Sequence, residues 1–69
     1  MMKQLIVGRT YKTNRSSLKI LIFDVVFCNQ EYVKAKIGLT QNGILCERPK
    51  YYKIQWKNIQ HWEIDYETM

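Results

Sequence analysis

The stretch from residue 50 to residue 64 interleaves aromatic rings with cations, a combination that can bind a polyanion. Residues 51–57 alternate with the period of two that places successive side chains of a β-strand on opposite faces. The inward set is Tyr52, Ile54 and Trp56, and the outward set is Tyr51, Lys53, Gln55 and Lys57. Lysine ammonium groups neutralise phosphates and tyrosine rings stack on bases, so the outward set is suited to nucleic acid.

A second segment carries the same chemistry. Residues 31–39 alternate as well, with Val33, Ala35, Ile37 and Leu39 inward and Tyr32, Lys34 and Lys36 outward. The polar segment near the N-terminus adds a basic loop with Arg9, Lys12, Arg15 and Lys19. The predicted binding residues are therefore Arg9, Lys12, Arg15, Tyr32, Lys34, Lys36, Tyr51, Lys53 and Lys57. They form one site only if the two outward sets lie side by side.

The charge distribution agrees with an anionic partner. The net charge is +5, but residues 1–57 hold all 11 basic residues against three acids (+8), and residues 58–69 hold three acids alone (−3). Such a field favours polyanions through phosphate neutralisation and counterion release. A second explanation of the lysines stays open, because outward lysines also keep strand edges from pairing with other chains.

Protein binding is the alternative function. A free-standing small module with exposed aromatic side chains acts by contact, for example as a phage or bacterial accessory factor that binds a host protein. Trp56 and Trp62 are potential anchors, although we expect most of their area in the core. An edge at residues 44–47 would also permit a homodimer by strand addition.

Catalytic and metal-binding motifs are not evident. His61 is the only histidine, and no serine, cysteine or aspartate forms a recognisable nucleophile motif with it. Cys28 and Cys46 do not form a C-x-x-C pair or a zinc spacing. We therefore expect a non-enzymatic protein without cofactor or metal. Two free thiols are the favoured state, and a Cys28–Cys46 disulfide is the alternative.

The length of 69 residues predicts a single domain, residues 1–69. So short a chain buries only about 60% of the surface that its unfolded form exposes, so large side chains must supply the core. The longest apolar run, residues 18–28, is too short and too charged to span a bilayer, and no signal peptide is evident. These features predict a soluble, cytoplasmic protein that does not act at a membrane.

The N-terminal half predicts two strands. Residues 3–7 form a short first strand, residues 14–17 form a loop, and Tyr11 anchors the segment between them to the core. Residues 18–28 form the central strand, with Leu18, Ile20 and Ile22 on one face and Leu21, Phe23, Val25 and Phe27 on the other. Because both faces are apolar, this strand is either buried on both sides or strongly bent, and Asp24 is a plausible bulge site.

The C-terminal half predicts turns between short strands. Asn29-Gln30 forms a turn, Asn42-Gly43 forms a hairpin, residues 44–47 return, and residues 48–50 break that strand. Asn58 caps a helical turn that points Ile59 and Trp62 the same way, and residues 63–66 form the last strand. Five or six short strands in this order predict an all-β fold, a small and highly curved barrel.

This layout resembles SH3-like barrels, the fold of Tudor, KOW and small phage or bacterial SH3-like modules. The resemblance lies in the basic loop that opens at residues 8–11, the Asn42-Gly43 hairpin, and the helical turn at residues 58–62 before the closing strand. Residues 56–64 are similar to closing segments of small phage and bacterial proteins of this type. The paired acidic residues and paired aromatics of peptide-binding SH3 domains are missing, so the resemblance does not imply recognition of PxxP peptides.

Overall fold

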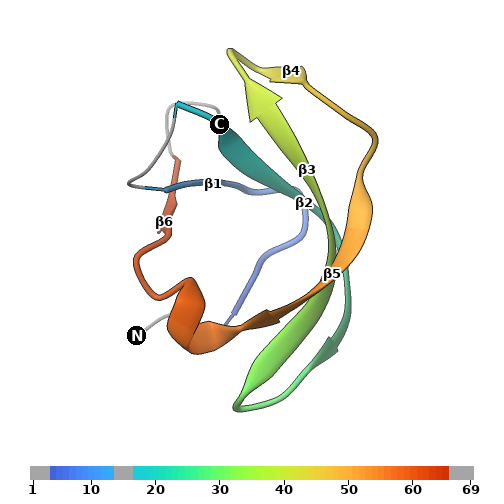
Figure 1. Cartoon of the computed structure of the whole chain (residues 1–69), viewed down its shortest axis with the longest axis vertical. Coiled ribbons are helices and arrows are strands. Elements are labelled where there is room, and N and C mark those ends of the chain that lie inside the picture. The colour runs from blue at the N-terminus through green and yellow to red at the C-terminus, as the bar shows by residue number, and fades with distance from the viewer. Residues whose placement is uncertain (1–3, 14–16, 66–69) are drawn as a thin grey trace.

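Two long strands, β2 (Lys19–Cys28) and β3 (Tyr32–Gln41), form the centre of a curved antiparallel sheet in the computed structural model (Figure 1). The structure describes residues 4–13 and 17–65. Four short strands and one 3₁₀ turn complete the fold: β1 (Thr10–Lys12), β4 (Ile44–Leu45), β5 (Lys50–Gln55), η1 (Trp56–Asn58) and β6 (Glu63–Ile64). The predicted all-β class with a helical turn before the last strand is confirmed.

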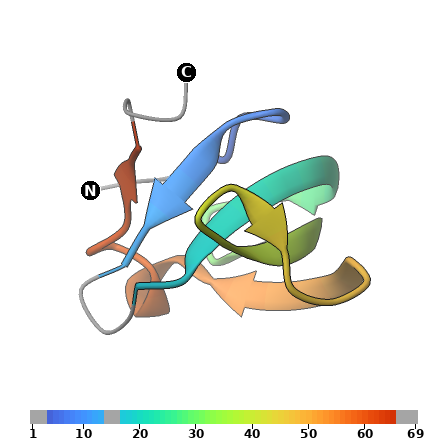
Figure 2. The same cartoon turned by 90° about the horizontal axis from the view of Figure 1, so that it is seen from above.

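The order of the strands makes the sheet wrap around a core. The sheet runs β4-β3-β2-β1-β6, and β5 also pairs with β3. The chain leaves β5 through η1 and returns to the opposite edge of the sheet, where β6 pairs with β1 (Figures 1 and 2). Among the strands of the described residues, no ladder joins β5 to β6. The structure therefore shows a strongly curved sheet that is not closed into a barrel by strand pairing.

Two irregularities bend β2. Its pairing with β3 shifts register between Ile22 and Asp24 and again between Val25 and Phe27, so Phe23 and Val26 are the extra residues of two β-bulges. The bulge expected near Asp24 is thus confirmed. The predicted face shared by Leu21, Phe23, Val25 and Phe27 is wrong, because each bulge reverses the alternation. Val25 now packs against the core, while Asp24 is turned out to solvent. Simple alternation would have buried this carboxylate next to Ile22, at a large desolvation cost.

The first strand begins later than expected. Residues 4–7 are not in a strand, although Leu5 is buried, and Lys3 lies outside the described residues. The Arg9 amide donates to the Ile6 carbonyl in a tight turn, in which Gly8 adopts a φ of +88°. That turn ends the N-terminal segment and lets β1 form within the stretch predicted as a polar loop. The predicted loop at residues 14–17 lies mostly outside the described residues.

Tyr11 anchors β1 to the core, as expected. Its side chain is almost fully buried, and its hydroxyl accepts a hydrogen bond from the Ile6 amide at 3.1 Å. Its ring lies 6.3 Å from that of Trp62, within the range of favourable aromatic pairs. One aromatic side chain thus fastens both the N-terminal segment and the turn before β6.

The two predicted turns are confirmed. The Asn29 side-chain oxygen accepts hydrogen bonds from the amides of Glu31 and Tyr32, both at 2.8 Å, which holds the β2–β3 turn. Asn42 and Gly43 have φ values of 54° and 81°, as a two-residue hairpin turn with two left-handed positions requires. The returning strand β4 is shorter than predicted, because only Ile44 and Leu45 pair with β3.

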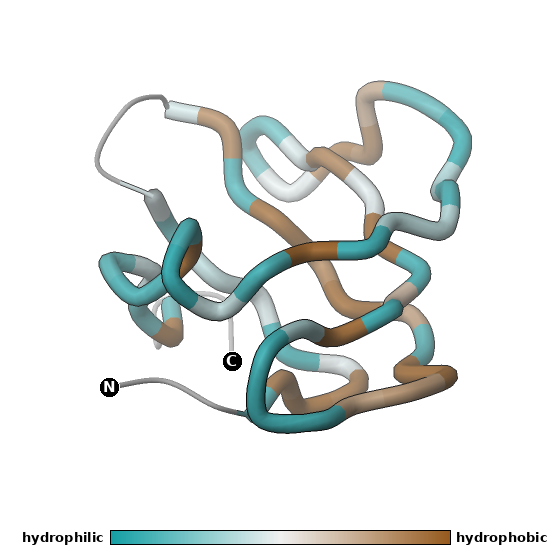
Figure 3. The backbone as a smooth tube through the Cα atoms, turned by 60° about the horizontal axis from the view of Figure 1, so that its bottom comes forward, coloured by the Kyte–Doolittle hydropathy of each residue, from teal (hydrophilic) through white to brown (hydrophobic). Residues whose placement is uncertain are grey.

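The core lies on the inner face of the curved sheet. The buried hydrophobic residues are Leu5, Tyr11, Ile20, Ile22, Val33, Ala35, Ile37, Trp56 and Ile59. The predicted alternation of residues 31–39 is confirmed, since Val33, Ala35 and Ile37 are buried and Leu39 packs against them. Hydrophilic and hydrophobic positions accordingly alternate along the strands (Figure 3). Tyr52 was expected in this core but is 45% exposed, although it lies opposite the buried Ala35.

Trp56 joins the end of β5 to the β2–β3 turn. Only 2% of the residue is exposed, and its indole Nε1 donates to the Asn29 carbonyl at 2.7 Å. Its backbone amide donates to the Glu31 carbonyl at 3.1 Å. The predicted burial is confirmed, but the strand ends at Gln55 and Trp56 begins η1. Asn58 therefore lies within the turn instead of capping it.

The second half of the helical turn behaves as predicted. Ile59 is buried, Trp62 packs against the core, and the Trp62 amide donates to the Ile59 carbonyl at 3.0 Å. Ile64 follows in β6 opposite Tyr11. Tyr66, predicted on the same face as Ile64, lies outside the described residues.

An ion pair between the acidic C-terminal segment and β2 sits beside β1. Asp65 is 1% exposed, and its Oδ2 lies 2.5 Å from the Nζ of Lys19 at the start of β2. The Asp65 amide also donates to the Thr10 carbonyl at 2.8 Å. Lys19 is therefore part of the structure and not of a basic binding loop. Asp65, the last described residue, thus ties the C-terminal end of the described chain to β2.

Neither cysteine is bridged in the structure. Cys28 and Cys46 are both exposed free thiols, which confirms the favoured expectation. Cys28 pairs with Val33 at one end of β3, while the Cys46 amide donates to Leu39 toward the other end. The six residue steps from Val33 to Leu39 along β3 span roughly 20 Å. A disulfide requires α-carbons within about 7 Å, so it would need a different fold.

Within residues 4–13 and 17–65, no helix has the length and apolarity needed to cross a membrane.

Replacing Trp56 with alanine should cost about 3–5 kcal/mol of the free energy of unfolding, because a buried indole and its hydrogen bond are both lost. In so small a domain this loss should abolish folding at room temperature. Trp56→Phe keeps most of the apolar volume but leaves the Asn29 carbonyl without its donor, and should cost about 1–3 kcal/mol. Urea unfolding followed by circular dichroism measures both values. A folded, stable W56A protein would contradict the assigned role.

Replacing Asp65 with asparagine should cost about 1.5–3 kcal/mol, because the partly exposed Lys19 ammonium loses its charged hydrogen-bond partner. Asp24→Asn is the matched control: Asp24 is exposed, and an asparagine oxygen can still accept the hydrogen bond from the Val25 amide. That control should change stability by less than about 0.5 kcal/mol. Equal effects of the two substitutions in urea unfolding would argue against a structural ion pair.

Candidate nucleic-acid interface

The register of β3 with β5 brings the two predicted outward sets together. Lys36 lies opposite Tyr51, Lys34 opposite Lys53, and Tyr32 opposite Gln55. Residues directly opposite in an antiparallel pair have Cβ atoms about 4.5–5.5 Å apart. Five of the nine predicted binding residues therefore share one continuous patch, the outer face. It consists of Tyr32, Lys34, Lys36, Tyr51 and Lys53.

Two of the lysines on the outer face lie over tyrosine rings. The Nζ of Lys53 is 4.4 Å from the ring centroid of Tyr32, and the Nζ of Lys36 is 5.7 Å from that of Tyr51. Cation–π contacts at exposed sites contribute about 0.5–1 kcal/mol. These contacts hold the ammonium groups close to the sheet surface, beside the aromatic rings. The outer face thus presents cations and rings together, as its residue types predicted.

Lys34 and Lys53 form a like-charge pair across two strands. Like charges directly opposite each other destabilise a sheet. No carboxylate lies within salt-bridge distance of either lysine among residues 4–13 and 17–65. An anion bound between them would remove this repulsion.

The protection of strand edges does not explain the lysines of β3. β3 pairs with β2 on one side and with β5 and β4 on the other, so Lys34 and Lys36 lie on a central strand. A central strand presents no free edge, and charges there serve no purpose in preventing edge-to-edge association. Only Lys53, on β5, remains explained in that way.

The neighbouring strand β2 extends the outer face. Phe27 lies opposite Lys34 and Asp24 opposite Lys36. Phe27 is 50% exposed, and its ring centroid is 5.6 Å from that of Tyr32. Phe27 was not among the predicted site residues, because an apolar residue of the central strand was expected to be buried. The bulge at Val26 is the cause: without it, Phe27 would have followed Val25 on the inner face.

The other predicted residues do not lie on the outer face. Lys57 is exposed but belongs to η1, since β5 ends before it, so its predicted place beside Lys53 is wrong. Lys12 lies in β1, and Arg9 is the residue directly before that strand. Strand β2 separates both residues from β3. Each strand adds a spacing of about 4.8 Å, so Arg9 and Lys12 are two strands from β3. Arg15 lies outside the described residues.

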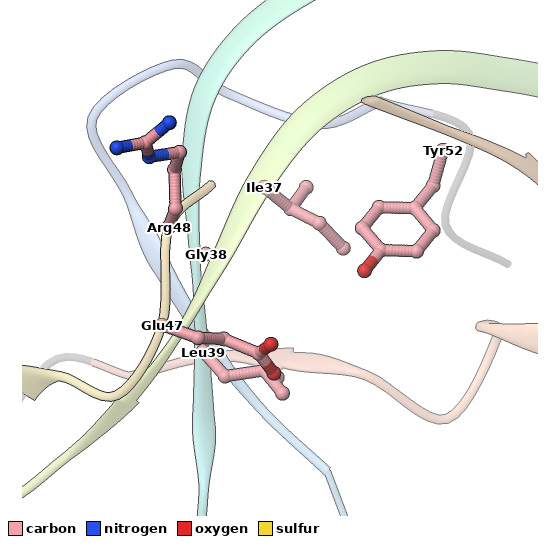
Figure 4. A pocket seen from close by; sticks show the side chains of 6 residues that line it. All are labelled: Ile37, Gly38, Leu39, Glu47, Arg48 and Tyr52. Atoms are coloured by element: carbon pink, nitrogen blue, oxygen red, sulfur yellow. The ribbon is translucent and has the colours of Figure 1, made fainter. Parts of the chain in front are cut away.

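A second surface feature is an apolar pocket on the inner side of β3 (Figure 4). It has a volume of about 240 Å³ and lies beside the exposed Tyr52. Its lining residues are Ile37, Gly38, Leu39, Glu47, Arg48 and Tyr52. Sites for drug-sized ligands usually have about 300–1,000 Å³, so this pocket suits a single apolar side chain better.

His61 lies away from both features. It borders a shallow depression with Lys12, Thr13 and Glu63, next to the pairing of β1 with β6. In the described part of the chain, no three histidine, cysteine or acidic side chains gather as metal ligands would. The best-developed candidate site is therefore the outer face.

Comparison with known proteins does not assign a family. No family model matches the chain, and no curated protein and no solved structure matches it. The outer face is therefore the main basis for a function.

Removing the like-charge pair should stabilise the protein. Lys34→Glu places a carboxylate opposite Lys53 and should raise the free energy of unfolding by about 0.2–1 kcal/mol. The gain should shrink at high salt, which screens exposed charges. Lys57→Glu makes the same charge change in an exposed position outside the outer face and is the control. Urea unfolding at low and high salt tests this, and a destabilised K34E protein would contradict the repulsion.

Proposed function

We propose that this protein is a small, non-enzymatic nucleic-acid-binding protein that uses the outer face of β3 and β5. The observation that carries the proposal is the register that sets Tyr32, Lys34 and Lys36 beside Tyr51 and Lys53. Lysines that neutralise phosphates and aromatic rings that stack on bases are the components of such sites. The three lysines and Asp24 give this face a local charge of +2 (three minus one).

The proposal extends to the fold. The curved sheet, the Asn42-Gly43 hairpin and the helical turn before β6 support the resemblance to SH3-like barrels, with η1 and Trp56 bridging the gap that strand pairing leaves. We propose that the protein is a member of this broad group. A fold of this kind does not determine function, so the assignment rests on the outer face.

Binding should depend on salt in proportion to the lysines engaged. For a single strand, the logarithm of the association constant falls against the logarithm of salt with a slope of about −0.7 per phosphate neutralised. Lys34→Gln/Lys53→Gln should therefore reduce the magnitude of that slope by about 1.4 and weaken binding at low salt. Fluorescence anisotropy of labelled DNA and RNA oligonucleotides, single-stranded and duplex, measures both quantities.

The matched control is Lys12→Gln/Lys57→Gln. It removes the same two charges from exposed positions outside the outer face. It should lower affinity only through the net charge, and less than the double variant on the outer face. If both double variants lose the same affinity, the charge of the whole protein, not the outer face, drives binding. Absence of binding to every oligonucleotide at low salt rejects the function.

Binding to a protein is the second candidate, and the apolar pocket is the observation that favours it. The pocket beside Tyr52 has the size of one apolar side chain, and the nearby strand β4 exposes Ile44 and Leu45. A partner, or a second copy in a homodimer, would add a strand at this edge and insert a side chain. Such a contact would be insensitive to salt, which distinguishes it from phosphate binding.

A further inference from the structure

We infer that the outer face binds single-stranded nucleic acid in preference to a duplex, with Phe27 and Tyr51 as the two rings on which bases stack. This inference rests on the proposed function and specifies its ligand.

Phe27 and Tyr51 are the accessible rings of the outer face. Phe27 is 50% exposed and Tyr51 is 54% exposed. Tyr32 is less exposed than either ring, because the Lys53 ammonium lies 4.4 Å from its ring centroid and the Phe27 ring packs against it. The Lys36 ammonium lies farther from the Tyr51 ring, at 5.7 Å, and leaves that residue 54% exposed. Phe27 therefore takes the place of Tyr32 as the stacking ring beside Tyr51.

The two accessible rings stand on opposite sides of the lysines. Phe27 is on β2 opposite Lys34, and Tyr51 is on β5 opposite Lys36. Two strand spacings across the sheet and two residues along it separate their backbone positions by about 12 Å. Lys34 and Lys36 lie on β3 between them. A strand that stacks one base on each ring would carry the intervening phosphates over these two ammonium groups.

A duplex cannot use this arrangement. Its base faces are covered by the neighbouring base pairs, so side-chain rings stack on unpaired bases that are splayed out. A duplex could use only the lysines and would leave two large apolar rings exposed to solvent. Stacking on a ring and neutralisation of phosphates do not read the sugar, so single strands of DNA and RNA should bind alike.

The test compares single-stranded and duplex oligonucleotides of about 12 nucleotides, a length within the usual site size of such proteins. Oligo(dU) and oligo(U) test the sugar, and a duplex of the same length tests the strand number. Anisotropy titrations at low salt should show at least about tenfold tighter binding of the single strand, and a DNA-to-RNA ratio within about threefold.

Leucine variants remove the ring faces while keeping apolar volume. Phe27→Leu and Tyr51→Leu should each weaken single-strand binding by at least about fivefold and leave duplex binding unchanged. Tyr52→Leu is the matched control, because Tyr52 is similarly exposed but faces the inner side of β3. Circular dichroism and urea unfolding verify that all three variants fold.

The possible outcomes separate the inference from the proposed function. Duplex binding equal to or tighter than single-strand binding, still weakened by Lys34→Gln/Lys53→Gln, overturns the single-strand inference and keeps the proposed function. Single-strand binding that survives both Phe27→Leu and Tyr51→Leu overturns the assignment of the stacking rings. Binding to neither form overturns both. A strong preference for DNA or for RNA shows that the sugar is read and contradicts the sugar-independent mode.

Discussion

The fold depends on the burial of Trp56 between the end of β5 and the β2–β3 turn. The strands of the described residues do not close on themselves, because no ladder joins β5 to β6. The buried Trp56 indole donates to the Asn29 carbonyl, and the Trp56 backbone amide donates to the Glu31 carbonyl. The chain can then turn through η1 toward β6. A domain of this size has few large side chains, so a single tryptophan can decide whether the core is complete.

The outer face depends indirectly on the same contacts of Trp56 with the β2–β3 turn. Trp56 holds the end of β5 against the β2–β3 turn, and this fixes the register that places Lys53 opposite Lys34. A slip of one residue would turn Tyr51 and Lys53 to the inner side and break the patch. The two bulges of β2 act in the same sense, since they turn Asp24 and Phe27 outward beside the lysines. The core and the outer face are therefore set by one arrangement of three strands.

Alternation and turn chemistry made much of the fold predictable. Residues 31–39 show a clean period of two, and Asn42-Gly43 is a strong local signal, so β3 and its hairpin were anticipated. Features that depend on distant contacts were anticipated only in part. Tyr11 was expected in the core, but the strand β1 around it was not. One bulge was expected near Asp24, but the second bulge and the reversed faces of β2 were not. For the site, the outward residues of β3 and β5 followed from alternation, but their adjacency and the role of Phe27 required the register. The loss of Lys57 from the patch followed from η1, which starts where Trp56 must turn inward.

The lysine pair at the centre of the outer face is the feature that folding stability explains least, and the proposed function would account for it. A sequence selected only for folding would place opposite charges, or a β-branched residue, across from Lys34 on a central strand. Here two cations stand opposite each other, two further aromatic rings remain exposed beside them, and the requirement to protect an edge does not apply to β3. Natural proteins break such local rules mainly at functional or strained sites. A polyanion with unpaired bases relieves both costs at once, because its phosphates neutralise the lysines and its bases cover the rings.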